Sequence, residues 1–304
     1  MNNLMLDGKN DLEYFLHLYE QGRDNTKIKR NTLETWDERA ERWGRELSTD
    51  CPFRRAVDER VLHTARYLRA RGILGENSNV IDIGCGPGRY AAEFARTAGH
   101  VTGIDLSKRM LDFAADYARE QGQENVSFIP CDFGEINVEQ QGWAQKFDLV
   151  FSSITPAVGT WEGLEKSMQM SRGFCFHSNY IHWYDELEQQ IARDVFQLAS
   201  YSRPMVALGR RKHYALCNLL FLKGYQPETR YHRQKRDDSG EINLDLAGYY
   251  ASLFTDDKAS LEKNTRLVYR YLETKADKKG AVRQCSERSY AWILWDVRLN
   301  TGVR

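Results

Sequence analysis

The spacing of apolar residues changes its period along the chain. Near the N-terminus they recur at helical intervals, as in Val57, Val61, Ala65 and Leu68, which is typical of an amphipathic helix. The pattern predicts helices over residues 11–20, 31–46 and 54–71. We interpret residues 1–52 as an N-terminal helical cap. Trp36 and Trp43, at helical spacing within it, either pack into a core or form one wall of a site.

From residue 79 onward, short apolar runs alternate with helical stretches. Such alternation predicts βαβ units and a parallel sheet. The expected strands are 79–84, 99–105, 125–130, 147–152, 173–177, 224–232 and 290–297. The expected helices are 90–97, 107–121, 161–171, 184–200, 208–223, 244–254 and 259–273. We therefore predict an α/β fold with a doubly wound, mostly parallel seven-stranded sheet over residues 53–304. A helical insertion at 236–288 would precede the last strand.

A glycine-rich loop, Asp82-Ile-Gly-Cys-Gly-Pro-Gly88, joins the first predicted strand to a helix. Glycines allow a tight turn and a close approach of the backbone to a ligand. The spacing is GxGxG, because Arg89 holds the position of the third glycine in dinucleotide-binding loops, and this counts against an NAD-dependent oxidoreductase. Asp105 ends the second strand, about 20 residues beyond the loop. An acid at this position can accept hydrogen bonds from both hydroxyls of a ribose. Together these features predict a nucleoside cofactor.

Residues 36–176, and most clearly residues 80–158, resemble the class I, Rossmann-like, S-adenosylmethionine-dependent methyltransferases. VIDIGCGPGRY looks like the first motif of that family, and GIDLS looks like its ribose-binding motif. VSFIPCDFGE resembles the adenine-side motif, and FDLVFSS resembles the fourth strand that closes the site. The resemblance implies S-adenosylmethionine as the cofactor and methyl transfer as the activity.

The resemblance also implies a role for each matching position. Asp82 would lie near the methionine part of the cofactor and Asp105 would hold the ribose hydroxyls. The remaining positions would line the glycine loop (Gly84, Gly86, Gly88), flank the adenine (Leu106, Met110), bind its polar edge (Asp132 and the backbone of Phe133) and lie near the methionine end (Ser152).

The acceptor side has weaker signals. A polar and aromatic cluster over residues 177–184 follows the fifth strand, at the end of a sheet where ligands bind. His177 or His182 is a candidate general base, and contacts that pack or cap helices are the alternative. The insertion at 236–288 could cover the site or be a decorative or oligomerising helical pair, which leaves a homodimer open.

Composition narrows the partners. The 43 basic and 43 acidic residues give zero net charge, which disfavours nucleic acid, since its binding rests on a positive field. The basic run at 210–236 either contacts phosphate or is a solvated face. We predict a small-molecule acceptor; RNA, protein, or cofactor binding without catalysis are the alternatives.

The remaining patterns bear on metal binding and location. The six scattered cysteines include no CxxC pair, so we expect no metal site. The N-terminus shows no secretory pattern, and no apolar run approaches the ~20 residues of a membrane helix. We therefore expect a cytoplasmic protein without membrane contact.

Overall fold

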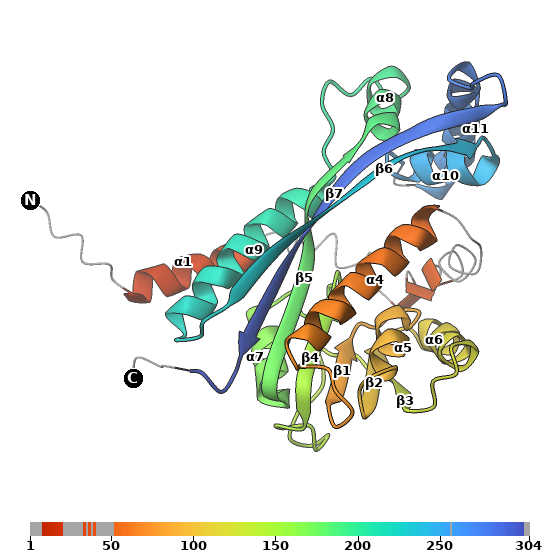
Figure 1. Cartoon of the computed structure of the whole chain (residues 1–304). Coiled ribbons are helices and arrows are strands. Elements are labelled where there is room, and N and C mark those ends of the chain that lie inside the picture. Colours follow the sequence, from red (N-terminus) through yellow and green to blue (C-terminus); the bar gives the residue numbers. More distant parts are fainter. Residues whose placement is uncertain are drawn as a thin grey trace, which may run out of the picture. The chain divides into compact units, whose positions relative to one another are not determined.

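The computed structural model describes residues 8–20, 33–34, 36–37, 39–40, 52–255 and 257–300. The described strands form one seven-stranded sheet in the order β3-β2-β1-β4-β5-β7-β6 (Figure 1). Strands β3, β2, β1, β4 and β5 pair in parallel, so the predicted fold class is confirmed. The strands are β1 (Asn79–Ile83), β2 (His100–Asp105), β3 (Val126–Pro130), β4 (Phe147–Ser153), β5 (Ser171–Asp185), β6 (Glu228–Glu241) and β7 (Ala281–Asp296).

Helices connect most of these strands. They are α1 (Gly8–Glu20), α4 (Pro52–Ala70), α5 (Arg89–Ala95), α6 (Lys108–Glu120), α7 (Trp161–Met170), α8 (Glu186–Asp194), α9 (Pro204–Leu222), α10 (Leu244–Ser252) and α11 (Lys258–Thr274). Helices α10 and α11 lie between β6 and β7, as the sequence predicted. Most of the predicted helix 31–46, including Trp43, lies outside the described residues. The domain bounds 1–52 and 53–304 stay predictions.

The chain divides into two compact units. Unit 1 comprises Met1–Asn179, Arg211–Arg230 and Ala291–Arg304, and unit 2 comprises Tyr180–Arg210 and Tyr231–Tyr290. Strands β5, β6 and β7 supply residues to both units. Each unit has its own buried core, and we describe the two separately.

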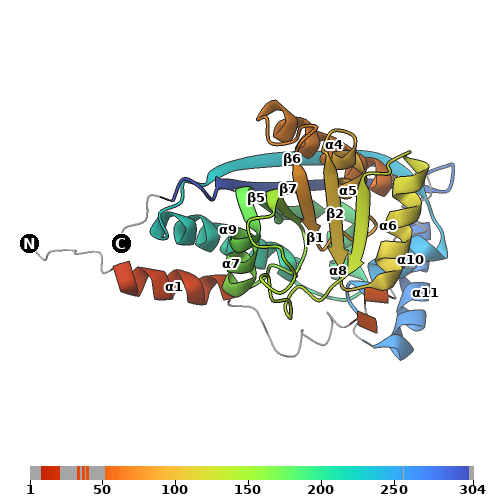
Figure 2. The ribbon, with the colours of Figure 1, turned by 90° about the horizontal axis from the view of Figure 1, so that it is seen from below.

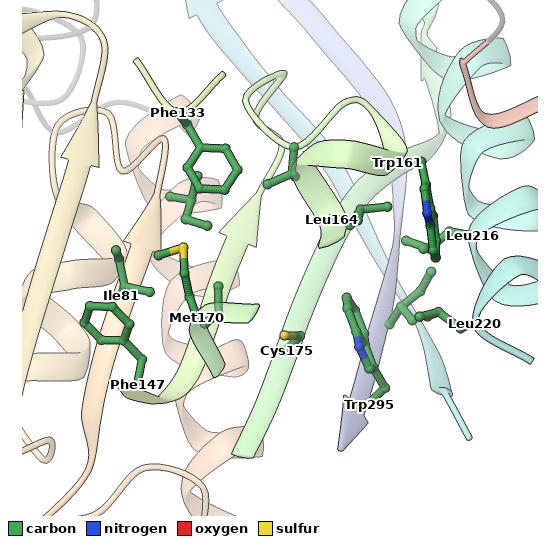
Figure 3. Close-up of a cluster of buried hydrophobic side chains, with 14 of the residues drawn as sticks. Ile81, Phe133, Phe147, Trp161, Leu164, Met170, Cys175, Leu216, Leu220 and Trp295 are labelled. Atoms are coloured by element: carbon green, nitrogen blue, oxygen red, sulfur yellow. The ribbon is translucent and has the colours of Figure 1, made fainter. Parts of the chain in front are cut away.

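Unit 1 buries apolar side chains on both faces of its strands. On one face, Phe151 stacks on Phe176 with ring centroids 4.8 Å apart and contacts Tyr90 and Phe94 of α5. On the other face, α1, α7 and α9 cover the sheet (Figure 2). There Trp161, Leu216 and Trp295 join a large cluster with Ile81 and Phe147 (Figure 3). Two covered faces explain why the strands read as continuous apolar runs.

Unit 2 has a smaller apolar core, formed by α8, α10, α11 and the start of β7. Here the strands are longer than predicted. β5 continues to Asp185 and β7 begins at Ala281, whereas the sequence pattern placed the corresponding bounds at residues 177 and 290. These added segments carry many polar side chains, so their apolar period is weak, and pairing between distant strands sets their conformation.

Candidate functional site

The glycine loop connects β1 to α5 in unit 1. Gly84, Gly86 and Gly88 have φ of 66°, 52° and 73°, a left-handed conformation that disfavours side chains. A Cβ on Gly84 would lie 2.1 Å from Thr155 Oγ1, and one on Gly88 would lie 2.7 Å from the Cβ of Ala114. At Gly84 and Gly88 the loop thus packs directly against the neighbouring chain and leaves no room for a side chain.

Asp105, at the end of β2, anchors this loop. Its Oδ2 accepts a hydrogen bond from the Gly86 N–H at 3.0 Å, and its Oδ1 accepts one from the Ser107 N–H at 2.9 Å. Burial raises the pKa of Asp105, against the lowering effect of these backbone hydrogen bonds. Each oxygen retains a further lone pair, so the oriented carboxylate can also accept hydrogen bonds from the hydroxyl groups of a ligand.

Asp82 is a buried acid in β1, only 2% exposed. Its Oδ2 has no hydrogen-bond partner among the described residues. Burial, and then the charge of Asp105, raise its pKa to about 8. Burying a carboxylate oxygen without a donor is unfavourable. A cation or donor from a ligand would complete this position.

The structure adds an acid that the sequence analysis missed. Ser107, the N-cap of α6, accepts the Met110 N–H, and its hydroxyl donates to Asp37 Oδ1 at 2.5 Å. Asp37 also raises the pKa of Asp105. No local pattern links residues so far apart in sequence. Next to this group, Met110 is buried and Leu106 half-buried.

Asp132 and Phe133 follow β3. Asp132 is exposed, and its Oδ1 accepts the Gly134 N–H at 3.0 Å. The Phe133 ring is buried in the large cluster of unit 1 (Figure 3). The Asp132 side chain thus stabilises a turn, while the Phe133 ring fixes where that turn leaves the sheet.

Ser152 and His177 lie side by side on the neighbouring strands β4 and β5. The Ser152 hydroxyl donates to the Phe176 carbonyl at 3.2 Å and lies 3.0 Å from His177 Nδ1. A hydroxyl has one proton, so Nδ1 is the donor when that bond to Phe176 forms. Burial lowers the pKa of His177 to about 3, with smaller effects from Lys212 and His213. His177 is therefore neutral and a weak proton acceptor.

His182 belongs to unit 2. Its side chain is 38% exposed, with Nε2 3.8 Å from a Glu287 carboxylate oxygen. Arg210 approaches His182 Nδ1 at 3.2 Å. A guanidinium can only donate, so Nδ1 is the acceptor in that contact. The ring is thus oriented by Arg210 and retains access to solvent.

Two absences concern the described part of the chain. None of its helices combines the length and the apolar character needed to cross a bilayer. Its His, Cys, Asp and Glu side chains form no group of three or more that could hold a metal ion.

Comparison with known proteins matches the region of this site. Residues 74–191 match the model of a family described as a methyltransferase domain. The chain is 32% identical over 118 residues to a ubiquinone biosynthesis O-methyltransferase of Aromatoleum aromaticum, covering 39% of this chain and 47% of the relative. It is also 32% identical over 87 residues to EEF1A lysine methyltransferase 2 of Danio rerio, covering 28% and 37%.

A third relative acts on another kind of acceptor. A 23S rRNA (uracil-C5) methyltransferase of Aeromonas hydrophila is 32% identical over 118 residues, covering 38% of this chain and 25% of the relative. The chain therefore spans less than half the length of these curated relatives. Among solved structures, a putative methyltransferase from Bacillus halodurans has a TM-score of 0.47 at 13% identity, covering 77% of this chain and 98% of that one.

Proposed function

We propose that the protein transfers a methyl group from S-adenosylmethionine to a small-molecule acceptor, on the premise that residues 74–191, which match a methyltransferase-domain family, form a class I methyltransferase domain. The observation that carries the proposal is the buried, unpartnered Oδ2 of Asp82 in the strand that leads into the glycine loop. Such an atom requires a donor or a positive charge, and the cofactor offers both.

The residues of unit 1 fit this cofactor. Asp82 would hold the amino group of the methionine part, and Gly84, Gly86 and Gly88 would let the backbone approach the ligand. Asp105, already oriented by two backbone N–H groups, would accept the ribose hydroxyls. The other predicted positions would bind the adenine (Leu106, Met110, Asp132, Phe133) or lie near the methionine end (Ser152).

The bound cofactor would supply a methyl group on a positive sulfur. The chain would then contribute mainly by holding the reactants in line. Where the acceptor carries a proton, a base must remove it. The two candidate bases are His177, which lies beside Ser152 in unit 1, and His182, which lies in unit 2. The low pKa and burial of His177 suit a positioning role through Ser152.

The ion pairs made by the basic run at 210–236 favour a small acceptor over RNA. Three of its arginines pair with nearby acids: Arg230 with Glu228, Arg233 with Glu287 and Arg236 with Asp238. Side chains neutralised in this way contribute little to the release of counterions that drives binding to phosphates.

The test is to follow S-adenosylhomocysteine formation by the full chain with three acceptor pools: small acids and phenols, bulk tRNA, and total protein. We expect product only with the small molecules, and none with Asp105→Ala. Turnover confined to tRNA or protein would refute the acceptor class. Cofactor binding without turnover on any pool would indicate a binding protein without methyl transfer.

A further inference from the structure

One face of β7 in unit 2 is buried and yet polar. Gln284, Ser286, Arg288 and Tyr290 alternate along the strand and are 6%, 5%, 9% and 1% exposed. Buried strand faces are normally apolar, and charged side chains are rarely buried unless paired. Arg288 is the charged side chain on this face, and it is buried without such a partner.

The Arg288 side chain makes no hydrogen bond or ion pair with the described residues, and its Nε is buried without an acceptor. Its guanidinium carbon lies 3.9 Å from the centroid of the Trp183 ring. A second arginine, Arg203, lies 4.1 Å from the same centroid. Arg203 is fully paired, with Glu188 at 2.5–2.9 Å and with the Tyr249 hydroxyl at 2.8 Å. Two cations thus share one ring, and only Arg203 has its anion.

Aromatic rings continue from this stack. Trp183 contacts Tyr180 with centroids 5.1 Å apart, and Tyr180 contacts Tyr290 at 4.6 Å. The Tyr290 hydroxyl donates to Gln234 Oε1 at 2.8 Å. The buried cation therefore lies at one end of a row of rings, with polar groups at the other. A guanidinium favours carboxylates, which it can bind through two hydrogen bonds.

We propose that Arg288 binds the carboxylate of an organic acid, which supplies the anion that this buried guanidinium lacks. The binding site itself rests only on the contacts within unit 2. The ligand carboxylate supplies the anion that Glu188 supplies to Arg203.

The test is calorimetric titration of the full chain with 2-naphthoate and with its neutral amide. We expect 2-naphthoate to bind, and to bind Arg288→Gln about tenfold more weakly or worse, because a charge-assisted hydrogen bond is lost. Arg283→Gln is the matched control: it removes an exposed arginine from the same strand, paired with Asp237, and should bind like the wild type. The amide should bind weakly to all three proteins.

Three results would overturn the inference. Equal binding of 2-naphthoate to Arg288→Gln and the wild type would show that Arg288 does not bind the carboxylate. A large fall in the Tm of Arg288→Gln without ligand would make Arg288 structural, since loss of an unpaired buried charge should not destabilise. Tighter Arg288-dependent binding of inorganic phosphate would refute a carboxylate ligand. A parallel titration with S-adenosylhomocysteine separates the two proposals, because failure there refutes only the methyltransferase function.

Discussion

The proposed role of Asp82 would make the affinity for the cofactor depend on pH. Its pKa is raised to about 8, mainly by burial, so below that pH the carboxyl is largely protonated. A positive ligand requires the carboxylate, and binding must then expel the proton. We expect the affinity for S-adenosylmethionine to rise with pH from about 6.5 to 8.5, by up to about tenfold per unit. Asp82→Asn should bind more weakly and without that slope. Calorimetry across this range measures both, and a flat wild-type profile would contradict the role of Asp82.

Gly84 tests whether the loop needs space as well as a left-handed backbone. Gly72 has nearly the same φ, 68° against 66°, but nothing lies within 4 Å of a Cβ built there. Alanine at either position costs about 1–2 kcal/mol of backbone strain. Gly84→Ala should lose more free energy of unfolding in urea, and should lose S-adenosylhomocysteine binding, because its Cβ meets Thr155. Equal losses of unfolding free energy in the two variants would show that the Thr155 side chain moves aside without cost, and would contradict this prediction.

At the scale of elements, Arg89 joins three helices. It begins α5, pairs with Asp58 of α4 and stacks on Tyr117 of α6 at 4.1 Å. It is only 6% exposed. Asp58→Ala would leave this guanidinium buried without that acid, and should lower the free energy of unfolding by about 1–3 kcal/mol. Asp116→Ala, which breaks the exposed pair with Arg119, should change it by less than about 0.5 kcal/mol. Similar urea midpoints for both variants would refute the role of Arg89.

The helices and strands also show which parts of the fold can be predicted from the sequence. β1, β2 and β4 are short and covered on both faces, so apolar runs and glycines sufficed to locate them. The same reasoning placed the glycine loop and Asp105. It ended β5 near residue 177, because the segment that follows mixes buried Tyr180 and Asp185 with exposed Tyr184. Asp37 beside Ser107, and Arg288 on Trp183, arise from chain folding between distant positions, which no local pattern records.

At the scale of the whole molecule, positive and negative charges balance in sum, and several arginines of the basic run pair with nearby acids. Zero net charge combines with local pairing of Arg230, Arg233 and Arg236. We therefore expect no saturable binding of bulk tRNA in a filter assay at about 50 mM salt, where phosphate contacts are strongest. Tight binding with a steep salt dependence would contradict this account and favour an RNA acceptor.

The most direct test of the central claim is calorimetric titration of the full chain with S-adenosylhomocysteine and with NAD, repeated on Asp105→Ala. The account predicts that S-adenosylhomocysteine binds the wild type, that NAD does not, and that Asp105→Ala weakens binding about tenfold or more, since hydrogen bonds to a charged group are lost. Circular dichroism would confirm that the variant is folded. Binding of NAD alone, or unchanged binding of S-adenosylhomocysteine to Asp105→Ala, would contradict the account.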